Sequence, residues 1–136
     1  MEQLRIFIIG ITGLLGSEAA RQLEKDGHHI SGLSLPTYPE NLPFSKNIKF
    51  QLGSYLTLSA DELRTMLAGY DALIFAAGID ERVKTKPSAY ETFNRYNVEP
   101  LEKILQVAKE VGITRSVILG SYFTYFNETR PQLKLA

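Results

Sequence analysis

Three glycines spaced three residues apart, Gly10, Gly13 and Gly16, constrain this chain more than any other feature. An apolar run over residues 4–9 opens directly into them, and an amphipathic pattern follows over residues 14–23. This order predicts a strand, a tight turn and the first turn of a helix. Gly10 would supply a backbone conformation that side chains resist, Gly13 would let a ligand approach the backbone, and Gly16 would allow close contact between helix and strand.

A helix that begins at such a turn presents unpaired backbone N–H groups and a partial positive charge. With a strand before it and a helix after it, the turn predicts a site for the pyrophosphate of a dinucleotide. The alternative is a purely architectural turn, since glycines also close strand-to-helix connections. A Walker-type phosphate loop is excluded, because it needs a lysine and then Ser or Thr, whereas Gly16 is followed by Ser17 and Glu18.

Length and composition favour a single domain with its own core. A chain of 136 residues is expected to bury about two-thirds of its unfolded surface. The absence of cysteine excludes disulfides, thiolate metal sites and cysteine nucleophiles, and it favours a cytoplasmic location. Fifteen basic and fifteen acidic residues balance without a block of like charge, which argues against nucleic-acid binding. Neither a signal peptide nor an apolar run of roughly 20 residues, as a membrane span needs, is expected.

Strands and helices are expected to alternate along the chain. The apolar patterns predict strands over residues 4–9, 28–35, 48–52, 71–78 and 116–120, and helices over residues 14–26, 59–69 and 97–112. Ser59 and Glu62 have the spacing of a capping box, and three prolines between residues 36 and 46 predict an irregular crossover. The simplest fold for this alternation is α/β, a doubly wound parallel sheet with five strands in the order 3-2-1-4-5.

The residues that mark a ligand site all follow predicted strands, so they are expected at one edge of the sheet. They are residues 10–16, Ser34, residues 53–55, Ala76, Ala77, Gly78 and Ser121. The small residues after the fourth strand leave space for a ligand to lie across it. His28 and His29 are instead expected in a turn and a strand entry, because a metal pair would want further ligands nearby. Residues 80–82 either face a substrate or lie in a solvated loop.

Three segments together carry a family resemblance: Gly-Ile-Thr-Gly-Leu-Leu-Gly at residues 10–16, Phe-Ala-Ala-Gly at 75–78, and Tyr-Asn-Val-Glu-Pro-Leu at 96–101. Over nearly its whole length the chain resembles the first half of an extended short-chain dehydrogenase/reductase of the NAD-dependent epimerase/dehydratase type, with a Rossmann-like fold. The resemblance implies NAD or NADP as cofactor, with contacts at Gly10, Thr12, Gly13, Leu14, Leu15, Gly16, Ser34, Ser54, Tyr55, Ala76, Ala77, Gly78 and Asn97. It also places Ser121 at the family's catalytic serine.

Two departures from the family concern the cofactor. NAD-preferring relatives usually carry Asp or Glu after the second strand, whereas this chain has neither an acid nor an arginine around Ser34. Ser34 either bonds a cofactor hydroxyl or phosphate or simply ends the strand. Where relatives commonly have an adenine-contacting aspartate, Ser54 offers a hydroxyl, and Tyr55 offers a backbone amide or a ring edge. The alternative for Tyr55 is a half-buried core aromatic.

A third departure concerns the chemistry. The family's general acid/base is a tyrosine four residues before a lysine, but Tyr122 is followed four residues on by Phe126, and Tyr125 by Thr129. The chain by itself is therefore predicted to be inactive. It is expected to be the N-terminal fragment of a longer protein, with residues 1–136 forming an NAD(P)-binding domain truncated before the last strands.

Three functions remain open at this point. The first is the cofactor half of an NAD(P)-dependent epimerase, dehydratase or oxidoreductase that acts on a nucleotide sugar or a related carbonyl or alcohol, with Ser121 bonding the reacting oxygen. The second is a non-catalytic dinucleotide-binding module that regulates or engages a partner, and the third is a Rossmann-like domain whose cofactor site has decayed. The apolar residues 117–119 of the fifth strand predict a sheet edge that pairs with a second copy in a homodimer.

Overall fold

The computed structural model describes residues 2–77 and 99–119. Within these ranges, strands and helices follow one another in the order β1 (Arg5–Ile9), α1 (Leu14–Lys25), β2 (His29–Ser34), β3 (Lys49–Leu52), α2 (Ala60–Leu67), β4 (Ala72–Phe75), α4 (Glu99–Glu110) and β5 (Arg115–Ile118). The strands form one parallel sheet in the order β3-β2-β1-β4-β5. The predicted Rossmann-like topology is therefore confirmed, with β1 at the centre of the sheet.

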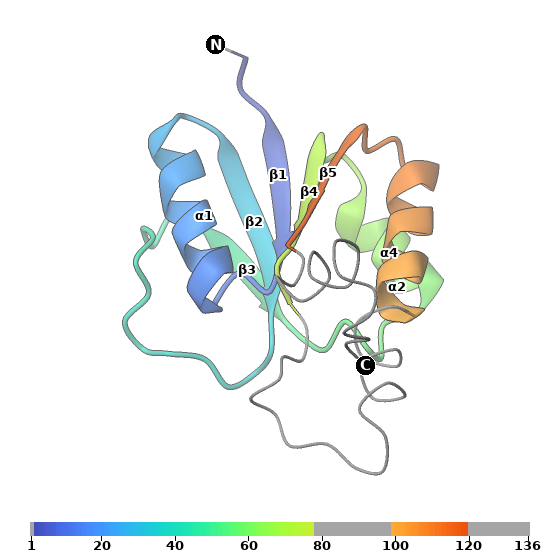
Figure 1. Ribbon diagram of the computed structural model, residues 1–136, viewed down its shortest axis with the longest axis horizontal. Coiled ribbons are helices and arrows are strands. Elements are labelled where there is room, and N and C mark those ends of the chain that lie inside the picture. Colours follow the sequence, from blue (N-terminus) through green and yellow to red (C-terminus); the bar gives the residue numbers. More distant parts are fainter. Residues whose placement is uncertain (1, 78–98, 120–136) are drawn as a thin grey trace, which may run out of the picture.

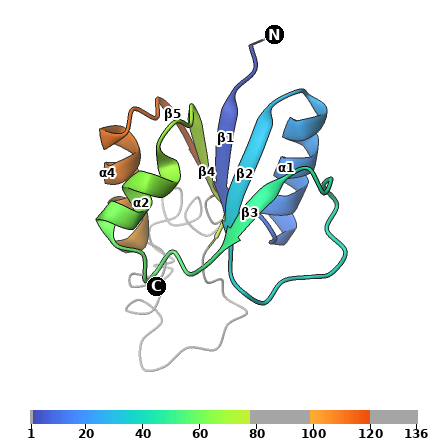
Figure 2. The same cartoon turned by 180° about the vertical axis from the view of Figure 1, so that it is seen from behind.

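Helices cover both faces of this sheet (Figures 1 and 2): α1 lies on one face, and α2 and α4 lie on the other. The alternation of side chains along β1 supplies both cores. Phe7 and Ile9 pack on the side of α2 and α4, while Ile6 and Ile8 pack on the side of α1. A central strand that is buried on both faces accounts for the continuous apolar run at the start of the sequence.

The predicted boundaries are close to the observed ones, and the largest difference falls at the end of the fourth strand. The fourth strand ends at Phe75 and not at residue 78, and the fifth occupies Arg115–Ile118 and not residues 116–120. Gly27, Gly69 and Gly112 each follow the end of a helix, and they adopt positive φ angles of 95°, 87° and 90°. The predicted start of the last helix, Asn97, lies outside the described residues.

The crossover between β2 and β3 is irregular, as the prolines predict. Instead of a helix, this crossover contains aromatic side chains that pack against β3. The ring centroids of Tyr38 and Phe44 lie 5.3 and 6.1 Å from that of Phe50, in edge-to-face arrangements. The hydroxyl of Ser45 donates a 2.7 Å hydrogen bond to Glu24, which ties the crossover to α1.

The pair α2 and α4 is held by apolar packing and by charged groups at its rim. On α2, Leu63, Met66 and Leu67 are buried. Arg64 bonds Glu110 of α4 at 2.8 Å, and the pKa of Glu110 is lowered by this hydrogen bond. On α4, Ile104, Val107 and Ala108 are buried.

Candidate functional site

The glycine turn connects the end of β1 to the start of α1. Gly10 has a φ of +88°, and its N–H donates to the carbonyl oxygen of Leu33 at 2.9 Å. A β-carbon at Gly10 would lie 2.9 Å from the backbone of Ala76. Both the backbone conformation and the close approach of β4 therefore require glycine at this position, as predicted.

Gly16 and Gly13 differ in what surrounds them. A β-carbon at Gly16 would lie 2.1 Å from the carbonyl oxygen of Gly10, so the predicted close contact between helix and strand is confirmed. Gly13 has φ −74° and ψ 171°, an extended conformation that any residue adopts, and a β-carbon there would meet only the Gly10 oxygen, at 3.4 Å. The fold itself does not require glycine at Gly13. Its absence of a side chain leaves the backbone open to a ligand.

The N-terminus of α1 differs from that of α2 in the way expected of an anion site. Gly13 caps α1 without a side-chain hydrogen bond, and the first turn of α1 contains no acidic residue. In α2, by contrast, Ser59 and Glu62 form the predicted capping box, with two hydrogen bonds of 3.1 Å. The first turn of α1 therefore combines a positive partial charge with free access, which suits a pyrophosphate.

The turn is fastened to the end of β2 by a pair of hydroxyl groups. Thr12 Oγ1 and Ser34 Oγ lie 2.6 Å apart, and Ser34 Oγ also donates to the carbonyl oxygen of Leu35 at 2.8 Å. Ser34 is only 2% exposed. Of the two roles considered for Ser34, this arrangement favours a strand-end serine, because its hydroxyl is directed inward and engaged.

The remaining predicted contacts lie after β3 and β4. Ser54 Oγ accepts a hydrogen bond from the N–H of Leu56 at 3.2 Å. Tyr55 is buried and meets the ring of Phe75 edge-on, with centroids 5.4 Å apart, which supports its interpretation as a core aromatic. Ala76 follows β4, and its N–H donates to Ile9 at 2.8 Å. Three further predicted site residues, Gly78, Asn97 and Ser121, lie outside the described residues.

Exposed leucines lie at or after the carboxyl ends of β1, β2 and β3. Leu14 and Leu15 are 88% and 62% exposed, so these two residues are not part of the core-facing side of α1. Sequence reasoning did not identify the others, which share a position at or just beyond a strand's carboxyl end and are Leu35, Leu52 and Leu56. An apolar rim around a few polar groups is typical of cofactor sites. Their positions in the sequence could have identified them, because open parallel sheets bind ligands at the carboxyl ends of their strands.

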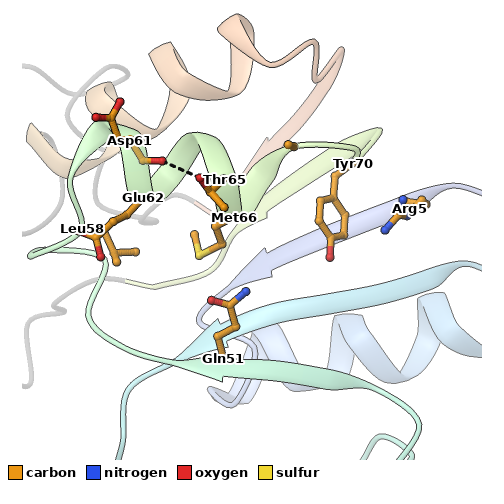
Figure 3. A pocket seen from close by; sticks show the side chains of 9 residues that line it. Arg5, Gln51, Leu58, Asp61, Glu62, Thr65, Met66 and Tyr70 are labelled. Carbon is orange, nitrogen blue, oxygen red and sulfur yellow. Dashed lines mark hydrogen bonds between the residues drawn. The ribbon is translucent and has the colours of Figure 1, made fainter.

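A separate hollow opens between α2 and β3 (Figure 3). Its charged groups are already engaged. Glu62 belongs to the capping box, Asp61 bonds Arg64 at 2.6 Å, and the Arg5 guanidinium lies 5.0 Å from the ring centroid of Tyr70. We therefore interpret this hollow as a surface recess and not as a ligand site.

Neither histidine takes part in a metal cluster within the described residues. His28 Nδ1 accepts a 3.1 Å hydrogen bond from the N–H of Leu4, and the N–H of His29 donates to the Leu4 carbonyl oxygen at 2.9 Å. These contacts confirm the predicted roles in a turn and a strand entry. None of the helices in residues 2–77 and 99–119 is long and apolar enough to cross a membrane.

Solved structures resemble this fold over most of the chain. Epimerase Mth375 from Methanothermobacter thermautotrophicus is 25% identical, with a TM-score of 0.72, and the match covers 89% of this chain and 36% of that one. WbmH from Bordetella bronchiseptica in complex with NAD+ is 22% identical, with a TM-score of 0.66. That match covers 85% of this chain and 38% of the WbmH chain. MoeE5 in complex with UDP-glucuronic acid and NAD is 18% identical, with a TM-score of 0.70. That match covers 86% of this chain and 36% of the MoeE5 chain.

The chain therefore spans less than half the length of these solved structures. No match was found among curated protein sequences. The model of the NAD dependent epimerase/dehydratase family matches residues 6–134, which is nearly the whole chain. The glycine turn, the open start of α1 and the strand order agree with that match. The chain belongs to the NAD dependent epimerase/dehydratase family.

Proposed function

We propose that residues 1–136 form the cofactor-binding domain of a longer NAD(P)-dependent enzyme, an epimerase, dehydratase or other oxidoreductase. The observation that carries this proposal is the contrast between the two helix starts. At the N-terminus of α1, Gly13 makes no side-chain capping hydrogen bond and the first turn contains no acidic residue. At the N-terminus of α2, the side chains of Ser59 and Glu62 form a capping box. Such a difference is expected if the first turn of α1 receives an anion from outside the protein.

In this proposal the backbone N–H groups at the start of α1 hold the pyrophosphate, and Gly13 gives it room. The exposed side chains of Leu14 and Leu15 lie beside it as apolar contacts. The nicotinamide would supply a hydride acceptor or donor. Ser121 would hydrogen-bond the reacting oxygen of the substrate, and a tyrosine from beyond residue 136 would move the proton.

The substrate class is a nucleotide sugar or a related carbonyl or alcohol. Its support is the family and the fold shared with MoeE5, whose structure holds UDP-glucuronic acid and NAD. The balanced charge of the chain fits a small-molecule substrate in the full-length protein, with neither nucleic acid nor a membrane as partner. The absence of cysteine fits a cytoplasmic location.

Calorimetric titration with NAD and NADP, on the wild-type chain and on Gly13→Val, tests the cofactor site. Valine is compatible with the extended backbone at Gly13, and its side chain would occupy the space left for the pyrophosphate. We expect the wild type to bind a dinucleotide and the variant to lose binding while circular dichroism remains unchanged. Gly27→Ala is the matched control, because Gly27 ends the same helix at its far side and its positive φ makes alanine mildly destabilising.

The control separates loss of the site from loss of stability. Binding should persist in Gly27→Ala. If the wild-type chain is well folded and binds neither dinucleotide, or if Gly13→Val binds as tightly as the wild type, the proposed cofactor site is wrong.

A non-catalytic dinucleotide-binding module is the second candidate. It is favoured by the lack of a tyrosine followed four residues later by a lysine around Tyr122 and Tyr125. The sequence of the parent gene discriminates the two functions. A Tyr-x-x-x-Lys soon after Ala136 would support the enzyme, and its absence would support the module.

We also infer that the chain associates with itself through β5. This strand lies at one end of the described sheet, and its residues Val117 and Ile118 are exposed, as is the following Leu119. Exposed apolar edges of sheets promote strand pairing. Sedimentation velocity is expected to give a dimer or larger species that Val117→Lys weakens. A sharply monomeric wild type at high concentration would contradict this.

A further inference from the structure

The carboxyl edge of the sheet carries no formal charge in the segments that follow β1, β2 and β3. These segments are residues 10–17, 35–39 and 53–60, and none contains Asp, Glu, Lys or Arg. The chain nevertheless has fifteen acidic and fifteen basic residues. The nearest charge along α1, Glu18, is paired with Arg21 at 2.5 Å. Within these three segments, backbone dipoles are therefore the groups that can attract an anion.

The end of β2 is the place where dinucleotide-binding folds discriminate between NAD and NADP. An acid there accepts hydrogen bonds from the adenosine ribose and disfavours a 2′-phosphate, while an arginine nearby favours the phosphate. In this chain Ser34 is buried and bonded to Thr12, so its hydroxyl is directed away from solvent. Leu35 is the first exposed side chain, at 54%, and the exposed residues Pro36 and Thr37 follow it.

We propose, building on the cofactor-binding function above, that this site binds NAD and NADP with nearly equal affinity. In residues 35–39, which follow β2, the 2′-phosphate of NADP meets neither a repelling carboxylate nor an attracting guanidinium. The pyrophosphate, common to both dinucleotides, supplies the shared electrostatic attraction at α1. Leu35 is the position at which a single added charge would set the preference.

Calorimetric titration of the 136-residue chain with NAD and then NADP tests the proposal directly. For the wild type we expect dissociation constants that agree within about fivefold. Leu35→Arg is expected to shift the ratio about tenfold toward NADP, and Leu35→Asp about tenfold toward NAD, as one exposed charge near a phosphate predicts. Because Leu35 is exposed, both variants should keep the wild-type circular dichroism spectrum.

Gln3→Arg and Gln3→Asp are the matched controls. Gln3 is exposed and precedes β1, so these variants change the net charge at the amino end of the sheet and not at the end of β2. They should leave the ratio of the two dissociation constants unchanged.

Three results would overturn the proposal, and they differ in what else they refute. A wild-type preference above about thirtyfold for either dinucleotide would refute equal recognition while leaving the cofactor site intact. Charge changes at Leu35 that move the ratio no more than those at Gln3 would refute the role of Leu35. A folded chain that binds neither dinucleotide would refute the proposed function as well.

Discussion

Replacing Gly16 by alanine tests the closest approach between helix and strand. The added methyl carbon would lie 2.1 Å from the carbonyl oxygen of Gly10 and 2.9 Å from its carbonyl carbon. Both partners are backbone atoms, so no side chain can rotate away. Ordinary contact would require α1 to move away from β1 by more than about 1 Å, since ordinary contact with that oxygen begins at 3.4 Å. Such a shift would also disturb the burial of Ala20 against the sheet.

Overpacking of this kind typically costs about 1–3 kcal/mol, and a contact between two backbones belongs at the upper end. Alanine regains about 1 kcal/mol through its better helix propensity. We therefore expect Gly16→Ala to lower the free energy of unfolding by about 2 kcal/mol. Gly13→Ala is the matched variant: its methyl group meets only one oxygen at 3.4 Å, and its stability should lie within about 1 kcal/mol of wild type.

Urea unfolding followed by far-ultraviolet circular dichroism measures both free energies on the same scale. Because, of the two glycines, only Gly16 lies in close contact with another backbone, Gly16→Ala should have a clearly lower free energy of unfolding than Gly13→Ala. If Gly16→Ala is as stable as the wild type, or if the two variants lose equal stability, the close approach of α1 to Gly10 does not require glycine at residue 16.

Three further changes have expected outcomes. Ser59→Ala removes the capping box of α2 and should cost about 1 kcal/mol of unfolding free energy, measured by urea titration; no loss would contradict the capping role. Ser34→Ala leaves the hydroxyl of Thr12 without its 2.6 Å partner and should cost about 1 kcal/mol, whereas Thr12→Ser, which keeps the pair, should cost less. The hydrogen bond from Arg21 lowers the pKa of Glu18 from 4.5 to about 2. Because the pKa is lower in the folded state, this pair stabilises the fold above pH 4.5, and the contribution is lost as the pH falls toward 2. Glu18→Gln should flatten that part of the pH profile of the urea midpoint, and an unchanged slope would contradict it.

Much of the fold was predictable because its signals are local. The apolar run of β1, the glycine turn and the capping box at Ser59 each lie within a few consecutive residues, and each was identified correctly. The strand order followed from the alternation of these elements, since parallel strands need crossovers of consistent hand.

The features that escaped prediction depend on contacts between distant residues. The bond between Thr12 and Ser34 exists only because the turn after β1 and the end of β2 meet at one edge. The amphipathic pattern over residues 14–23 did not show which of its apolar residues are buried: Leu14 is exposed, whereas Ala20 is buried. Likewise, the prolines predicted an irregular crossover without indicating that Phe44 would pack on Phe50.

The central claim is that the N-terminus of α1 receives the pyrophosphate of a dinucleotide. Amide chemical shifts of the ¹⁵N-labelled chain, recorded during titration with NAD, test it most directly. The claim predicts large, saturable shifts at Leu14, Leu15 and Gly16, with little change at Ala60 and Glu62 in the self-capped start of α2. Saturable binding that leaves the amides of α1 unmoved would contradict the claim.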